Sequence, residues 1–306
     1  MKTLRDALES GEFILTAECV PPKGTDIVEF CNHARRLLGK VHAVNVNDNP
    51  AATLHASPLA LSKVLLDMGH DPICQITGRD RNRLAIQSDL LGLHILDIRN
   101  VLCLTGDDIM MGNQKEGKAV FDLESVEILQ VIRSLNEGKE MTGKPIQGAT
   151  SLLPGAAVSP EAEPLEPVLI QFKRKIEAGA RFFQTQAIFQ PDRFERFMEQ
   201  ARKSNVSILA GVLLLRSLKM ARYVTEHLGI RVPDRFVQKL ERAGKEGELE
   251  AGIEITIGLI EAIRGKCDGI HLMAIGAEEQ IPVILERAGL LPKGPGLKKA
   301  AGGANG

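Results

Sequence analysis

Short runs of apolar, often β-branched residues recur along the chain, and most of them stop abruptly at polar residues. The run 101–104 is typical, because four apolar residues lead straight into Thr105, Gly106 and Asp107. An unbroken apolar run of this length is typical of a parallel strand that is buried on both faces. Eight strands are predicted in this way, at residues 13–18, 43–47, 72–77, 100–105, 147–152, 182–186, 207–214 and 269–273.

Segments with apolar residues at helical spacing alternate with these strands. They predict helices at residues 27–38, 58–68, 81–91, 124–136 and 165–178, one that opens at Pro191, and one at 278–288. Extra helices are predicted before the last strand, at residues 218–228, 232–242 and 249–264.

The number of strand–helix units sets the expected fold. Eight of them in one chain of 306 residues predict an α/β protein of the (β/α)8 type, a TIM barrel, rather than an open doubly wound sheet. We expect a single domain at residues 1–291. The tail at 292–306 is mainly Gly, Lys and Ala without periodicity, so we expect it to be disordered.

The amino-acid composition argues against several classes of function. The chain is 44% hydrophobic with a formal net charge of -1, so it can bury a large core, and binding to nucleic acid or a membrane surface by bulk charge is not expected. No apolar run reaches the roughly 18 residues of a membrane span, and the charged amino terminus does not resemble a signal peptide. The five cysteines contain no C-x-x-C pair and the histidines share no helical spacing. These patterns predict free thiols in a cytoplasmic protein and no metal site.

Barrel geometry predicts which side chains meet at the active site, because such enzymes build it at the carboxyl ends of the strands. The residues at or just after these ends are Glu18, Asn47, Asp48, Thr77, Asp107, Ser151, Gln186, Leu215 and Met273. Carboxylates and amides gathered on one rim form a candidate site. The alternative is the ordinary polarity of solvated loops.

Three of these side chains have a specific chemical use. Glu18 precedes a turn with two prolines, so its carboxyl group would be partly desolvated and available as a general acid; a rim carboxylate paired with Lys or Arg is an equally good interpretation. Asp107 follows Gly106, which admits a planar ligand, although the residues alone slightly favour a capping role for Asp107 or Asp108. Gln186 can donate to and accept from a heterocycle at once.

Two further segments suggest phosphate binding. Basic residues within 171–175 lie in a predicted helix and could reach a diphosphate, but a solvated helix face is the usual meaning of such a run. Residues 112–118 have the spacing of a P-loop, yet Ala119 replaces the required Ser or Thr. No G-x-G-x-x-G motif follows a predicted strand, so neither nucleotide hydrolysis nor a Rossmann-type site is supported.

An ordered set of motifs runs through the chain, at residues 16–22, 104–107, 159–162, 172–180, 185–189 and 230–233. The most specific part is the Lys-Arg-Lys and Ala-Gly-Ala of 173–180, followed by Thr185 and Gln186. Together these motifs resemble the methylenetetrahydrofolate reductase family, flavin-dependent barrel enzymes that convert 5,10-methylenetetrahydrofolate to 5-methyltetrahydrofolate. The resemblance covers residues 13–290.

The resemblance implies a role for each matching residue. Reduced flavin transfers hydride to the one-carbon unit of tetrahydrofolate, which first opens to an iminium cation, so the site needs a proton donor and a nearby negative charge. Glu18 matches the family's acid, Asp107 its carboxylate beside flavin and pterin, and Gln186 its folate-binding amide. Leu218 takes the place of an aromatic residue that stacks on the folate or nicotinamide.

Flavin-binding positions also follow from the resemblance. They are Asn47, Asp48, Thr105, Gly106, Asp107, Ser159, Ala162, Gln171, Arg174 and Lys175, with the last two near the phosphates. These roles replace the capping interpretation of Asp107 and the solvated-face interpretation of the basic helix.

The chain departs from the family pattern at several positions. Thr105 stands where many members have Arg, Ser159 where a His precedes Pro-Glu-Ala, and Val168 where an Asp is usual, so contacts to the flavin ribose and phosphates are partly rewritten. We expect FAD, with FMN as the alternative. The reductant is NAD(P)H or a partner protein that docks over the flavin, and the loss of the stacking aromatic residue at Leu218 favours the partner protein. We also expect an oligomer.

Two other functions compete with this one. The first is a pterin-binding barrel methyltransferase without flavin, and the second is a flavin-binding subunit of a larger electron-transfer complex. The resemblance leaves the physiological direction open, and also whether the pathway is methionine biosynthesis or anaerobic carbon fixation.

Overall fold

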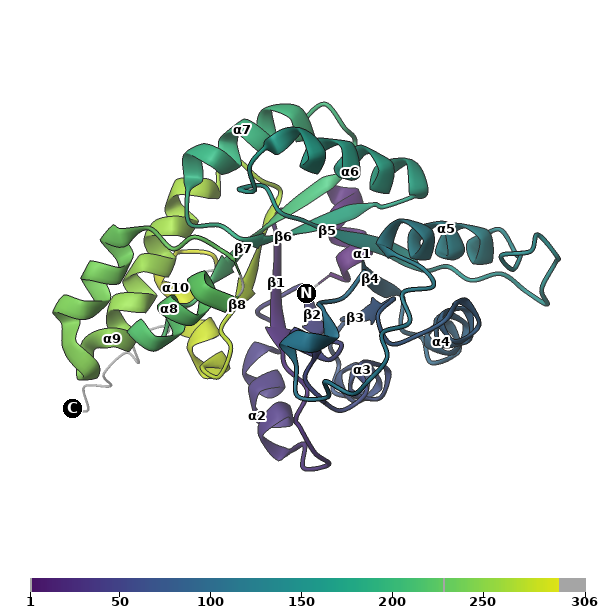
Figure 1. Cartoon of the computed structure of the whole chain (residues 1–306), viewed down its shortest axis with the longest axis horizontal. Coiled ribbons are helices and arrows are strands. Elements are labelled where there is room, and N and C mark those ends of the chain that lie inside the picture. Colours follow the sequence, from purple (N-terminus) through teal and green to yellow (C-terminus); the bar gives the residue numbers. More distant parts are fainter. Residues whose placement is uncertain (1, 228, 292–306) are drawn as a thin grey trace, which may run out of the picture.

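Parallel strands close into a barrel in the computed structural model, which describes residues 2–227 and 229–291 (Figure 1). Each strand pairs with the next, and β8 pairs with β1 to complete the cylinder. The predicted (β/α)8 fold is therefore confirmed, whereas the predicted tail at 292–306 lies outside the described residues. The strands are β1 (Ile14–Cys19), β2 (Ala43–Val46), β3 (Pro72–Thr77), β4 (Asn100–Leu104), β5 (Leu153–Val158), β6 (Phe182–Ala187), β7 (Ser207–Leu213) and β8 (Gly269–Met273).

Helices surround the barrel and connect its strands (Figure 1). The α-helices are α1 (Leu4–Ser10), α2 (Val28–Leu37), α3 (Pro58–Asp67), α4 (Arg83–Ile95), α5 (Ser125–Asn136), α6 (Leu165–Ala178), α7 (Pro191–Ala201), α8 (Leu218–His227), α9 (Asp234–Ile263) and α10 (Ile281–Arg287). Short 3-10 helices are η1 (Pro50–Ala52), η2 (Ile109–Met111) and η3 (Glu278–Gln280). Within the described residues, none of the helices combines the length and the apolar character that a membrane crossing requires.

The helices before the last strand differ from the prediction in one respect. The segments predicted at 232–242 and 249–264 are parts of α9, which continues through a local kink at Gly244, where φ is 64° and ψ is 169°. The expectation of extra helices before β8 is confirmed, because both α8 and α9 lie between β7 and β8.

Side chains inside the barrel change from apolar to polar along the strands. The layer nearest the amino-terminal end is apolar and packs against Leu4 and Ala7 of α1, which closes that end. It consists of Ile14, Ala43, Ile73, Leu102, Leu153, Phe182 and Leu209. A larger apolar cluster packs the surrounding helices against the outer faces of the strands. Two residues further along several strands the inward side chains become polar, since successive side chains of a strand alternate between its faces.

The fifth strand is displaced from its predicted position at 147–152. It begins at Leu153 and includes Pro154 and Gly155, a pair typical of turns, so the prediction was wrong. Gly155 is needed here because the ring of Phe182 fills the space of its missing side chain, with ring atoms 2.2 and 2.5 Å from an ideal Cβ. Ser151 consequently lies before the start of β5, where its carbonyl accepts a 2.7 Å hydrogen bond from Arg5. It is not part of the barrel mouth.

Candidate active site

Polar side chains from β1, β2, β6 and β8 form a hydrogen-bonded layer inside the barrel. Asn45 and Gln184 exchange two amide hydrogen bonds, of 2.6 and 2.9 Å. Gln184 also donates to Oγ1 of Thr16 at 3.3 Å, and this oxygen lies 2.9 Å from Nδ1 of His271. All four side chains are buried. The amide nitrogen of Gln184, which can only donate, also lies 3.3 Å from Nδ1 of His271, and Nε2 faces the carboxylate of Glu18, so Nδ1 is the acceptor and Nε2 carries the proton.

Glu18 lies next to this layer, near the carboxyl end of β1, and is 8% exposed. Its Oε1 accepts hydrogen bonds from Nδ2 of Asn47 at 3.0 Å and from Nε2 of His271 at 3.4 Å. No Lys or Arg among the described residues pairs with Glu18, so the interpretation as a rim carboxylate paired with a basic residue does not hold there. Since Oε1 already serves two donors, Oε2 is the oxygen free to carry an acidic proton.

Two buried polar groups near the mouth have unused hydrogen-bonding capacity. Oδ1 of Asn47 is buried and has no partner within the described residues. Gln75 lies on β3, one position beyond the paired Val46 and Cys74, and is 7% exposed; in the described chain its amide makes no hydrogen bond. Leaving Oδ1 of Asn47 buried without a partner costs about 1–3 kcal/mol. The Gln75 amide is not fully buried and bears less of this cost, but both groups can accept a ligand that supplies partners.

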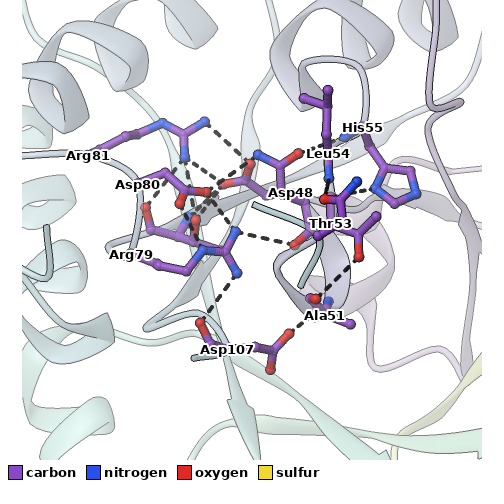
Figure 2. Close-up of polar contacts among 12 residues, drawn as sticks. Asp48, Ala51, Thr53, Leu54, His55, Arg79, Asp80, Arg81 and Asp107 are labelled. Carbon is purple, nitrogen blue, oxygen red and sulfur yellow. Dashed lines mark hydrogen bonds and ion pairs between the residues drawn. The ribbon is translucent and has the colours of Figure 1, made fainter. Parts of the chain in front are cut away.

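Asp107 lies just after β4 and is exposed (Figure 2). Its Oδ2 accepts a 2.9 Å hydrogen bond from the backbone N–H of Ala51. The capping role predicted for Asp107 or Asp108 belongs to Asp108, whose Oδ1 accepts from the N–H of Met110 at the start of η2. Gly106 has a φ of +100°, and a Cβ there would lie 2.8 Å from Cβ of Arg79. The protein itself therefore requires a glycine beside Asp107.

Asp48 is buried and engaged with its own chain. Its Oδ2 accepts from the backbone N–H and the hydroxyl of Thr77, both at 2.9 Å, and from Nη1 of Arg81 at 2.6 Å (Figure 2). These bonds tie the loop after β2 to the end of β3. A flavin contact by the Asp48 side chain stays a prediction.

A cavity of about 390 Å³ lies between the ends of β4 and β5 and the helices α5 and α6. Four of the predicted cofactor-binding residues line it: Thr105, Ser159, Gln171 and Lys175. Val168 lines it too, in place of the carboxylate expected from the family pattern. Thr105 also accepts a hydrogen bond from the N–H of Ser125 at 3.3 Å, which fixes the start of α5 at the cavity wall.

Lys175 brings a positive charge to this cavity. Its Nζ donates to the carbonyl of Ala157 at 2.7 Å, and in the described part of the chain no carboxylate pairs with it. Burial lowers the pKa of this ammonium group, since the charged form loses hydration. An anionic ligand would supply the missing counter-charge. Arg174, by contrast, is exposed and does not line the cavity, and Ala162 lines a separate cavity of about 620 Å³.

The remaining residues predicted to bind folate lie on β6 and α8. Gln186 is exposed, and its amide has no hydrogen-bond partner among the described residues. Leu218 begins α8 and packs, half-buried, against the outer apolar cluster. Leu215, expected at the end of the seventh strand, is fully buried in that cluster and contributes nothing to a ligand surface.

Comparisons with known proteins point to one family. A profile described as "Methylenetetrahydrofolate reductase" matches residues 3–289. The chain is 26% identical to methylenetetrahydrofolate reductase 2 of Schizosaccharomyces pombe, over 95% of this chain and 47% of that protein. It is 24% identical to the 5,10-methylenetetrahydrofolate reductase of Escherichia coli, over 44% of this chain and 47% of that protein. The match with the yeast protein thus spans about half of that protein's length.

Solved structures share the fold at low sequence identity. One is described as an uncharacterized protein from Clostridium thermocellum that binds two copies of 5-methyl-5,6,7,8-tetrahydrofolic acid; its TM-score is 0.67 at 15% identity, covering 94% of this chain and 99% of that one. Another is oxaloacetate acetylhydrolase, with a TM-score of 0.53 at 9% identity over 97% and 90% of the two chains. At these identities the likeness establishes the barrel fold only.

Proposed function

Because the chain belongs to the methylenetetrahydrofolate reductase family, we propose that it reduces 5,10-methylenetetrahydrofolate to 5-methyltetrahydrofolate with a bound flavin as hydride donor. The observation that carries the proposal is the buried carboxyl group of Glu18, which Asn47 and His271 hold through one oxygen while the other stays open. This arrangement suits an acid that protonates a bound substrate. A related barrel described as binding 5-methyltetrahydrofolic acid supports a folate as the substrate.

The reaction opens a carbon–nitrogen bond of the folate and leaves an iminium cation that is then reduced. Oε2 of Glu18 donates its proton to the departing nitrogen, and the hydrogen bonds from Asn47 and His271 to Oε1 stabilise the carboxylate that remains. Asp107 has no Lys or Arg paired with its carboxylate in the described chain, so its negative charge is available to the cation. Gln186 binds the pterin through its free amide.

The residues at the mouth and in the neighbouring cavity fit a flavin, which supplies the hydride when bound. Lys175 would hold a phosphate, because its half-buried ammonium group lines the cavity and forms no ion pair in the described chain. Asn47 and Gln75 would bind the polar edge of a ring through their unpaired groups. The other proposed contacts are Asp48, Thr105, Gly106, Asp107, Ser159, Ala162, Gln171 and Arg174. FAD is our choice of cofactor and FMN the alternative.

The electron source and the assembly belong to the same proposal. The reductant is NAD(P)H or a partner protein that docks over the flavin. Leu218, which replaces an aromatic residue, favours the partner protein. Rapid-mixing measurements of flavin reduction by NADH, NADPH and reduced ferredoxin distinguish these donors. We also propose a cytoplasmic location and an oligomeric state, which light scattering of the purified protein measures.

Anaerobic oxidation of the reduced flavin tests the function. Protein reconstituted with FAD or FMN, reduced with dithionite and mixed with 5,10-methylenetetrahydrofolate should regain oxidised-flavin absorbance and form 5-methyltetrahydrofolate. Glu18→Gln should bind flavin and be reduced normally, but react with the folate roughly 10²–10⁴-fold more slowly. Glu9→Gln is the control, since Glu9 is exposed on α1 at the opposite end of the barrel.

Other outcomes separate the competing functions. A protein that takes up neither FAD nor FMN would favour the flavin-free methyltransferase. One that binds flavin but does not pass electrons to the folate would favour an electron-transfer subunit. An unchanged folate reaction in Glu18→Gln would remove Glu18 from the role of acid.

A further inference from the structure

The loop after β2 has an unusual backbone at the barrel mouth. Asn49, Ala51 and Ala52 have φ angles of +44°, +51° and +51°, in the left-handed region that L-residues adopt only with local support. Alanine has no polar side chain that could offset the strain. The N–H of Ala51 is also the group that binds the carboxylate of Asp107. Backbone strain and a proposed catalytic group therefore meet at one peptide, a combination that points to function.

Arg79, which follows the end of β3, holds this loop (Figure 2). It is 1% exposed. Its Nη2 donates to the carbonyl of Asn49 at 3.2 Å, and its Nη1 donates to the carbonyl of Asp107 at 3.5 Å. The guanidinium group thus joins the strained loop to the backbone of Asp107. Gly112 packs against the same loop so closely that a Cβ there would lie 1.7 Å from the carbonyl oxygen of Ala52.

Asp80 takes up the charge of Arg79. Its carboxylate accepts hydrogen bonds from Nε and Nη2 of Arg79, at 2.8 and 2.6 Å, and this pairing lowers the pKa of Asp80. Arg79 reaches Asp107 only through a carbonyl, so the Asp107 carboxylate has no ion pair within the described residues. A direct ion pair would neutralise the negative charge that a substrate cation needs.

We propose that Arg79 is a positioning residue for Asp107. It fixes Asn49 and, through it, the strained peptide of Ala51, whose N–H binds Oδ2 of Asp107 and leaves Oδ1 for the cationic folate. The identity of that cation rests on the proposed function. The link from Arg79 through Ala51 to Asp107 does not, and it can be measured separately.

The test combines Arg79→Met with Ala51→Gly in the flavin-reconstituted protein. Glycine adopts positive φ without strain, so it should replace part of what Arg79 does if Arg79 acts by holding Ala51 in this conformation. Arg79→Met should raise amide hydrogen exchange of residues 49–56 and lower folate-dependent flavin oxidation, each roughly tenfold, while reduction by dithionite stays unchanged. Adding Ala51→Gly should reverse roughly half of each effect on a logarithmic scale.

Two further variants guard against a general loss of structure. Arg81→Met is the matched control, because Arg81 bonds Asp48, Asp89 and Thr77 but none of the residues 49–56, and Ala51→Gly should not restore what this variant loses. Ala51→Val increases strain at the loop without touching Arg79, since a β-branched residue disfavours positive φ. It should reproduce the Arg79→Met effects, and it decides the question if Arg79→Met does not fold.

Unchanged exchange at residues 49–56 in Ala51→Val and in folded Arg79→Met would overturn the proposal, as would a failure of glycine to restore Arg79→Met. If the wild-type protein shows no folate-dependent oxidation, the proposed function fails. The exchange measurements still decide whether Arg79 holds the loop.

Discussion

Among single residues, Lys175 is a half-buried cation that forms no ion pair with a carboxylate in the described part of the chain. Its ammonium group donates to a carbonyl, and burial lowers its pKa. Lys175→Met should weaken flavin binding, because a hydrogen bond to a charged group contributes about 1.5–3 kcal/mol, which is roughly 10- to 100-fold in Kd. Titration of the apoprotein with FAD and with FMN, followed by quenching of flavin fluorescence, measures the change.

Arg174→Met is the matched comparison, since Arg174 is adjacent in sequence but exposed and outside the cavity. It should change the flavin Kd less than Lys175→Met does. A larger effect at Arg174 would mean that the phosphate binds outside the cavity of Lys175. The stability of the Lys175→Met apoprotein should change little, because the variant loses one hydrogen bond to a carbonyl but also removes a half-buried charge that forms no ion pair.

The sequence predicted residues at strand ends better than residues inside strands. Glu18 and Asn47 were predicted as rim residues and do meet, at 3.0 Å. Gln75, which lies within its strand, was missed because an isolated amide in an apolar run has no distinctive pattern. Arg79 was missed for another reason: its role depends on backbone contacts between three loops, and carbonyl positions cannot be predicted from residue types.

At the scale of elements, the placement of β5 depends on one close contact. Gly155→Ala would place a methyl group 2.2 Å from the ring of Phe182, so it should lower the free energy of unfolding by about 1–3 kcal/mol. Gly258→Ala lies on α9 with nothing within 4 Å of the added Cβ, so it should raise that free energy by about 0.5–1 kcal/mol. Urea unfolding of both variants measures the difference. A neutral or stabilising Gly155→Ala would argue against a strand at Leu153–Val158.

The contact between Gly155 and Phe182 also explains why the position of β5 was predicted wrongly, although the positions of most other strands were predicted well. Uniform apolar runs such as Val101–Leu104 are specific enough to locate a parallel strand. Pro154 and Gly155 carry the opposite local signal, and their place in a strand is decided by Phe182, which is distant in sequence. Tertiary packing overrides local preference there.

For the whole molecule, closure of the barrel decides which groups share the mouth. The pairing of Thr16 with His271 joins β1 to β8 and places an imidazole beside Glu18, 253 residues earlier in the chain. Counting strand–helix units predicted that the barrel closes. It did not predict the register of closure, and therefore it could not predict the hydrogen bond from His271 to Glu18.

Buried histidines should control the response of the whole fold to mild acid. Burial lowers the pKa of His70 and of His42 below their ordinary value of 6.5, although Glu12 opposes the shift at His42; the pKa of His94 is lowered too, first by desolvation and then by Arg99. Below pH 6.5 the unfolded chain binds more protons at these rings than the folded chain does. Their contribution to the free energy of unfolding is therefore fully present above that pH and is lost as the pH drops toward the folded pKa values.

His70→Gln should isolate one of these groups. Nε2 of His70 donates to the carbonyl of Ala34 at 2.9 Å, and a glutamine amide can make a similar bond without titrating. Between pH 7 and pH 5.5 the wild-type free energy of unfolding should fall more than that of the variant, by on the order of 1 kcal/mol. Burial raises the pKa of Asp71 above its ordinary value of 3.8, and its titration would act in the opposite direction, but Asp71 is the same in both proteins, so its effect cancels in the comparison. Urea titrations at several pH values measure both curves, and parallel curves would show that His70 does not contribute.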